Sequence, residues 1–214
     1  MRGIYLHGFA SSARSSKART FADRLAPYDI VLEALDFNQP SFETLTITRM
    51  IEHAVRAIDG GSEPVALIGS SLGAFVAVHV AAQRAAVEKL VLLAPALDFA
   101  ETRMRDLGDD AIARWRETGL LDVFHYGFGR LAQVGYALYE DAARYDAFGL
   151  ELTQPMLVFQ GTRDAVVNPA VARKFASTRT NVTLRLLDDD HQLLSSMPDI
   201  WEETRVFLGL PARP

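Results

Sequence analysis

The chain has 214 residues, of which 49% are apolar, and this is enough to bury one substantial hydrophobic core. Its net charge is −5 at pH 7 without a run of five or six like charges, so the charge pattern does not indicate binding to a nucleic acid or an anionic membrane. The absence of cysteine excludes disulfides, thiolate metal sites and a cysteine nucleophile.

Neither a signal peptide nor a membrane span is expected. The opening segment MRGIYLHGFA has one arginine and an apolar stretch too short for a signal peptide. Residues 65–82 carry no formal charge and approach the length of a membrane helix, but a Gly-Ser-Ser run and a second glycine divide them. We interpret them as a strand buried on both faces followed by a buried helix, and we expect a cytoplasmic protein.

Six short apolar runs recur along the chain with helical patterns between them, which is typical of a parallel sheet built from βαβ units. The predicted strands are residues 3–7, 30–35, 65–69, 89–93, 156–160 and 182–187. The predicted helices are residues 15–26, 42–58, 72–86, 169–177 and 195–208. Right-handed crossovers would place these helices on both faces of the sheet.

The connection between the fourth and fifth predicted strands is longer than the others. Residues 98–150 within it hold nine of the chain's 20 aromatic residues, and its stretches DDAIARWRET and LAQVGYALYEDAARY have helical patterns. Some fifty residues bury too little surface to fold easily alone. We therefore predict a helical cap at about 98–150 within a single domain of residues 1–214.

A G-x-S-x-G pentapeptide, Gly69 to Gly73, lies between the third predicted strand and a helical run. A serine on a sharp strand-to-helix turn has a strained backbone that needs small neighbours, and the turn holds its hydroxyl above the sheet edge. By chance the pentapeptide occurs in roughly one chain in fifteen of this length, but its position here removes most chance cases. The pattern predicts Ser71 as a nucleophile, because Ser70 lacks the glycine spacing.

A serine nucleophile needs a histidine base and a carboxylate that orients it. In hydrolases of this topology the chain order is serine, acid, histidine, each at the carboxyl end of a strand. His191 satisfies this order, and Asp164 follows the fifth predicted strand in a short polar turn. The rival acids, residues 188–190, are too close to His191 in sequence to orient it well and are interpreted as solvated loop charges.

The oxyanion of a tetrahedral intermediate would need backbone donors. The N–H of Leu72, at the start of the helix after the serine, is one predicted donor. The N–H of Phe9, in the loop after the first strand, is the other. His7 closes that strand and is expected to hold the loop through hydrogen bonds.

The remaining histidines have simpler interpretations. His79 lies about two turns past Ser71 and is predicted to be packed, and His53 to be at the surface. The cap is expected to contribute to a substrate pocket, whose candidate residues are His7, Trp115, Phe124, His125, Tyr126 and Tyr136. No metal-ligand or nucleotide-binding motif is present in the sequence, so no metal and no cofactor is expected.

Four segments together resemble the small bacterial YqiA-like esterases of the alpha/beta-hydrolase superfamily: YLHGFASSARSSKA, GSSLGAF, FQGTRDAVV and DDDHQL. The likeness to the superfamily covers the whole chain. It implies a nucleophile at Ser71, an acid at Asp164, a base at His191 and oxyanion amides at Phe9 and Leu72. It also implies an alpha/beta-hydrolase fold with a wholly parallel core of six strands, since the two leading strands of larger relatives are absent.

These observations predict a serine hydrolase that cleaves small-molecule carboxylic esters or thioesters with apolar acyl groups of small to medium size. One alternative is an acyl-CoA or acyl-protein thioesterase, in which Arg14, Lys17 and Arg19 could contact a phosphate. A serine peptidase and a non-catalytic binding protein with the same fold are further alternatives. The acyl group, the leaving group and the oligomeric state stay open at this point.

Overall fold

The computed structural model describes residues 1–212, apart from the side chains of residues 102–105. Its centre is a six-stranded sheet in the order β2-β1-β3-β4-β7-β8, in which every pairing is parallel. The strands are β1 (Arg2–Leu6), β2 (Leu32–Leu35), β3 (Val65–Ser70), β4 (Val87–Leu93), β7 (Met156–Gly161) and β8 (Val182–Leu187). The predicted parallel sheet of six strands is confirmed.

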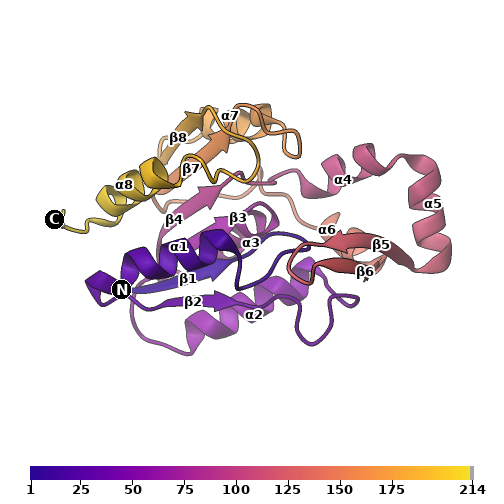
Figure 1. Cartoon of the computed structure of the whole chain (residues 1–214), viewed down its shortest axis with the longest axis horizontal. Helices are drawn as coiled ribbons and strands as arrows, with labels where there is room; N and C mark the ends of the chain where they lie inside the picture. The colour runs from indigo at the N-terminus through magenta and orange to yellow at the C-terminus, as the bar shows by residue number, and fades with distance from the viewer. Residues whose placement is uncertain (213–214) are drawn as a thin grey trace.

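Helices cover both faces of this sheet (Figure 1). Helices α1 (Ser16–Leu25) and α8 (Met197–Leu208) pack on one face, and a short 3-10 turn, η1 (Ala26–Tyr28), follows α1. Helices α2 (Ile47–Asp59), α3 (Leu72–Ala81) and α7 (Pro169–Ser177) pack on the other. The result is the three-layer arrangement that the crossovers predict.

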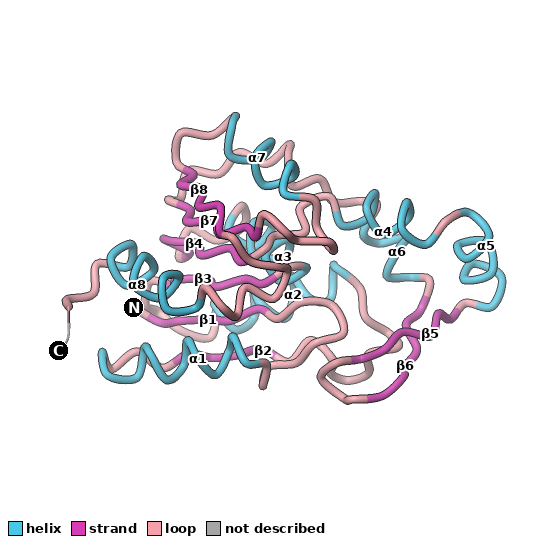
Figure 2. Tube along the Cα trace, turned by 45° about the horizontal axis from the view of Figure 1, so that its top comes forward, coloured by secondary structure: helices cyan, strands magenta, loops and turns pink. Residues whose placement is uncertain are grey.

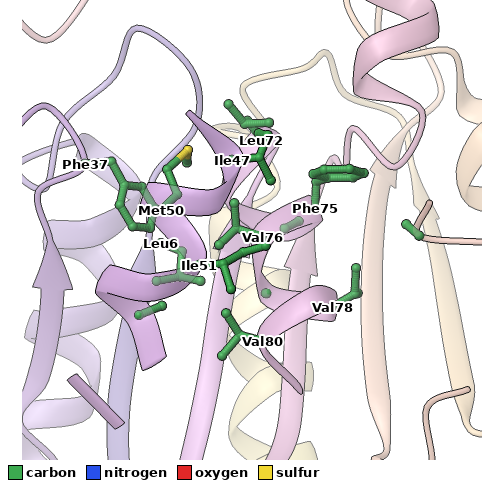
Figure 3. Close-up of a cluster of buried hydrophobic side chains, with 14 of the residues drawn as sticks. Leu6, Phe37, Ile47, Met50, Ile51, Leu72, Phe75, Val76, Val78 and Val80 are labelled. Carbon is green, nitrogen blue, oxygen red and sulfur yellow. The ribbon is translucent and has the colours of Figure 1, made fainter. Parts of the chain in front are cut away.

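Burial follows the position of each element. All six residues of β3 and of β7 are buried, whereas the edge strands β2 and β8 are only partly covered. All ten residues of α3 are buried, because this helix lies between the sheet and α2 (Figure 3). Side chains of Ser15, Thr46 and Asn168 accept backbone N–H groups at the starts of α1, α2 and α7, which fixes where these helices begin.

The insert between β4 and β7 lies beyond the carboxyl ends of the central strands (Figure 1). It contains α4 (Phe99–Leu107), α5 (Asp109–Thr118), β5 (Leu120–His125), β6 (Arg130–Gly135) and α6 (Ala137–Ala142). Strands β5 and β6 form an antiparallel hairpin that is visible in Figure 2. The helical interpretation of residues 131–145 is therefore wrong for the β6 part, where alternating burial and Gly129 at φ +65° favour a hairpin.

The insert packs into the same buried cluster as the sheet and α3, through residues such as Trp115, Val134 and Leu138. This shared core is the basis of our proposal that the chain forms one domain. None of the described helices is both long and apolar enough to cross a membrane.

Candidate active site

Ser71 occupies the turn between β3 and α3. Its backbone has φ +54° and ψ −118°, outside the regions that residues with side chains readily adopt. The N–H of Ser71 donates to Leu93 O at 2.9 Å, and its carbonyl accepts from Ala96 N and Phe75 N at 3.3 Å each. These bonds hold the strained turn at the carboxyl end of the sheet.

The two flanking glycines are required by close backbone contacts. A Cβ on Gly73 would lie 2.0 Å from Leu6 O, and a Cβ on Gly69 would lie 2.6 Å from Ala74 Cα. Backbone atoms cannot turn aside as a flexible side chain can. The turn that carries Ser71 therefore packs directly against the end of β1.

Asp164 follows β7, His191 follows β8, and a hydrogen bond joins them: His191 Nδ1 donates to Asp164 Oδ2 at 2.8 Å. The Asp164 side chain is fully buried, whereas that of His191 is 13% exposed. Asp164 Oδ2 also accepts from Gln160 Nε2, and Oδ1 accepts from Val166 N and Val167 N, each at 2.8 Å. Because Nδ1 is the donor in this pair, Nε2 is the nitrogen left to act as a base.

The hydrogen bonds to Asp164 also fix its charge. Burial raises the pKa of this carboxyl, but the bonds from His191, Val167 and Gln160 outweigh burial and hold the pKa below its usual value. Asp164 is therefore a carboxylate at neutral pH. The contribution of Gln160 was not foreseen, although a polar residue at the end of an apolar strand is a usable signal.

The three rival acids, Asp188, Asp189 and Asp190, contact residues of the loops that follow β7 and β8. Asp188 pairs with Arg163 at 3.2 Å, and Asp190 Oδ1 accepts from Gln192 N at 2.7 Å. Asp189 is only 3% exposed and accepts from the backbone N–H groups of Asp190 and Ser196. The interpretation of all three as solvated charges is wrong for Asp189, since it is buried and organises the loop that carries His191.

Ser71, Asp164 and His191 thus follow three strands at one edge of the sheet (Figure 1). Within the described part of the chain, no hydrogen bond joins Ser71 Oγ to His191. Such a bond is often long in an unliganded enzyme and tightens when substrate binds. The structure joins two of the three predicted residues directly and brings the third to the same edge.

The loop after β1 passes next to the serine. A Cβ on Gly8 would lie 3.1 Å from Ser71 Cβ and 3.7 Å from Ser71 Oγ, and Phe9 is the next residue. Leu72 is the first residue of α3, so its N–H has no partner within the helix. Of the two predicted oxyanion donors, Leu72 directly follows Ser71, and Phe9 follows Gly8, which lies against Ser71.

His7 holds this loop from beneath. Phe37 N donates to His7 Nε2 at 3.0 Å, so the ring proton is on Nδ1, which donates to Gly8 O at 2.9 Å. His7 as a whole is only 2% exposed. His7 therefore links the loops that follow β1 and β2.

A cavity of about 1000 Å³ opens between α3, the insert and α7. Its wall includes Phe75, whose N–H donates to Ser71 O, and Leu97, which follows another donor to that oxygen, Ala96. Phe99, Tyr139, Tyr145 and Phe148 supply further aromatic lining. Sequence patterns did not reveal this cavity, because four segments far apart in the chain form its wall.

None of the residues predicted for the substrate pocket is among those that line this cavity. Trp115 and Tyr136 are buried against each other, and Trp115 Nε1 donates to Val134 O at 3.0 Å. His125 is buried and bonds to Asn38 Oδ1 at 3.0 Å. Phe124 and Tyr126 are exposed on the hairpin. His7, as described, holds two loops.

The other histidines and possible metal ligands give no second site. His79 is buried on α3, where its Nδ1 donates to Phe75 O at 2.7 Å, and His53 is half-buried on α2 with its ring against Phe37. Among the described residues, no group of three or more histidine or carboxylate side chains is arranged to hold a metal ion.

A parallel sheet of this order, with a serine on a strained strand-to-helix turn, defines an alpha/beta-hydrolase fold. The chain belongs to the uncharacterised protein family UPF0227, whose family model matches residues 2–207. No curated protein sequence matches it.

Solved structures support the same fold. A protein from Agrobacterium vitis, provisionally designated a hydrolase, is 26% identical with a TM-score of 0.85, covering 96% of this chain and 87% of that one. Alpha/beta hydrolase domain-containing protein 10 from mouse is 18% identical with a TM-score of 0.82, covering 97% and 89%. Est1E from Butyrivibrio proteoclasticus, solved with ferulic acid, is 19% identical with a TM-score of 0.82, covering 97% and 87%. The predicted membership of the alpha/beta-hydrolase superfamily is confirmed.

Proposed function

We propose that the protein is a serine hydrolase that cleaves carboxylic esters through an acyl-enzyme. The observation that carries this proposal is the 2.8 Å hydrogen bond between His191 Nδ1 and the buried carboxylate of Asp164, at the sheet edge where the strained turn holds Ser71. A carboxylate in this position orients the imidazole and stabilises its protonated form.

In the proposed reaction, His191 Nε2 takes the proton of Ser71 Oγ while that oxygen attacks the ester carbonyl carbon. The N–H groups of Phe9 and Leu72 donate to the resulting oxyanion. The protonated His191 then gives its proton to the leaving alkoxide, and an acyl group remains on Ser71. A water molecule releases the acyl group in the second half, with His191 again as base.

The cavity beside Phe75 has the volume of a small-molecule pocket, but its wall mixes aromatic with acidic side chains and does not include Ser71, Asp164 or His191, so it does not define the acyl group. Thioesters fit the same chemistry. A contact between Lys17 and a coenzyme A phosphate is not favoured, since Lys17 is only 8% exposed. Arg14 and Arg19 stay exposed, and Arg19 Nη1 donates to Arg14 O.

A fluorophosphonate probe tests the proposal, because it reacts with a serine that a neighbouring base activates. The wild-type protein is expected to be labelled and Ser71→Ala to lose the label. Ser70→Ala is the matched control and is expected to keep most of it, since Ser70 is a buried residue at the end of β3. Labelling that persists in Ser71→Ala would overturn the assignment.

A further inference from the structure

His125 is a buried residue of the β5–β6 hairpin to which the proposed mechanism gives no role. Its neighbours Phe124 and Tyr126 are exposed, whereas His125 is fully buried. Its ring stacks on that of Phe128 with the centroids 3.7 Å apart and lies perpendicular to that of Phe42 at 4.5 Å. Buried ring nitrogens need hydrogen-bond partners, so the partners of His125 show what the hairpin is attached to.

The hydrogen bonds of His125 fix its tautomer and lead to Asn38, which is itself buried. Phe128 N donates to His125 Nδ1 at 3.1 Å, so the ring proton is on Nε2, which donates to Asn38 Oδ1 at 3.0 Å. Burial lowers the pKa of His125, which keeps the ring in this neutral form at neutral pH. The amide nitrogen of Asn38 is then left to donate, and it donates to Ser11 O at 2.9 Å.

The hairpin also touches the loop after β1 directly, since it lies beyond the carboxyl ends of β1 and β2 (Figure 1). Gly127, in the turn between β5 and β6, donates its N–H to Ala10 O at 3.3 Å. A Cβ on Gly127 would lie 2.9 Å from Ser12 Cβ. Ala10 has φ +52°, a strained conformation for a residue with a side chain. Contacts from the hairpin and from Asn38 therefore hold the loop in this conformation.

Ser11 transmits this restraint to the peptide group between Gly8 and Phe9. Ser11 O accepts from Asn38, and Ser11 N donates to Gly8 O at 3.3 Å. His7 Nδ1 donates to the same oxygen at 2.9 Å. Gly8 O and the Phe9 N–H belong to one trans peptide group, in which the two point in opposite directions. The bonds to Gly8 O therefore fix the direction of the N–H that is a predicted oxyanion donor.

We propose that Asn38 and His125 are positioning residues of the proposed active site: through Ser11 they hold the loop so that the Phe9 N–H is directed at the oxyanion. The hairpin of the insert thereby completes the oxyanion hole. This inference rests on the proposed function. The effect falls on the transition state, because the N–H stabilises a negative charge that the ground-state ester does not yet carry.

Asn38→Asp tests the inference, because it keeps the acceptor for His125 and replaces the donor to Ser11 O with an oxygen. For p-nitrophenyl acetate, kcat is expected to fall about tenfold or more while KM changes by less than about twofold. Asn38→Leu, which is uncharged and similar in volume, should give the same result and so separate the lost bond from the added charge. Amide hydrogen exchange should accelerate in residues 8–12 of both variants and stay unchanged in β3.

Asn181→Asp is the matched control. Asn181 lies directly before β8, at the amino end of the sheet, and its Nδ2 donates to Leu152 O and Gln154 O at 2.8 and 2.7 Å. The same substitution here also removes bonds to backbone carbonyls and is expected to lower the free energy of unfolding. Because these bonds are far from the loop after β1, kcat and KM should stay within about twofold of the wild-type values.

A wild-type kcat in both Asn38 variants would overturn the inference. A fall in kcat that Asn181→Asp matches would overturn it as well, because general loss of stability would then be the cause. Hydrogen exchange needs no turnover. A wild-type protein without hydrolase activity would reject the proposed function, and unchanged exchange in residues 8–12 of the Asn38 variants would still count separately against the inference.

Discussion

Gly73 shows how a single atom fixes the geometry of the candidate nucleophile. Its missing side chain lets the α3 turn approach Leu6 O so closely that a Cβ would lie 2.0 Å from that oxygen. Gly60, at the end of α2, has φ −71°, and a Cβ there would be 3.4 Å from Arg56 O. The two glycines differ in what surrounds them and not in residue type.

Gly73→Ala is expected to destabilise the protein by at least about 3 kcal/mol, because backbone must move to relieve the clash. Gly60→Ala should change stability by less than about 1 kcal/mol. Denaturant unfolding of the two variants measures the difference. Equal stabilities would show that the turn is not packed against β1 as described.

At the residue scale, the catalytic candidates can be predicted from their order along the chain. Ser71, Asp164 and His191 can be predicted because each follows a strand, and parallel strands end at one edge. The burial of Asp189 and Lys17 cannot be predicted in this way, because charged residues next to loops are usually solvated. Their environment depends on packing between segments that are distant in sequence.

At the scale of elements, the insert is held to the core by a polar contact between α6 and α2. Asp141 Oδ2 accepts from Thr48 N at 2.6 Å, and Oδ1 accepts from Thr48 Oγ1 at 2.7 Å. Tyr145 OH lies 2.7 Å from the same Thr48 hydroxyl. The Asp141 side chain is only 11% exposed, so water competes poorly for these bonds.

Asp141→Ala is expected to reduce the free energy of unfolding by about 2 kcal/mol, because two bonds to a charged acceptor are lost and the Thr48 N–H is left without its acceptor. Amide hydrogen exchange should accelerate in α6 and leave β3 unchanged. Asp122→Ala, at an exposed position on β5, is the control and should have little effect. Unchanged exchange in α6 would contradict this account of how the insert is attached.

The insert is also where sequence reasoning is weakest. The core strands are apolar runs with clear limits, whereas β5 and β6 are partly exposed and mix polar with aromatic residues. The signal in the sequence is the glycine-rich turn after His125, which contains Gly127 and Gly129. The helical pattern of α6, directly after β6, concealed the hairpin.

At the scale of the whole molecule, the fold is predictable because a parallel sheet needs strands buried on both faces and a helix in each crossover. The position of the cavity cannot be predicted from the sequence, because its wall joins α3, the insert and α7. Its lining therefore depends on how the insert rests on the core. The fold thus supports the proposed reactive group better than it supports any particular substrate.

Pre-steady-state hydrolysis of p-nitrophenyl acetate tests the central claim most directly. The account predicts a burst of p-nitrophenol close to one equivalent per protein, with one acetyl group found by mass spectrometry on the peptide that contains Ser71. His191→Gln should remove the burst, because Ser71 then has no base. Linear turnover with an unmodified Ser71, or an acetyl group on another residue, would contradict the account.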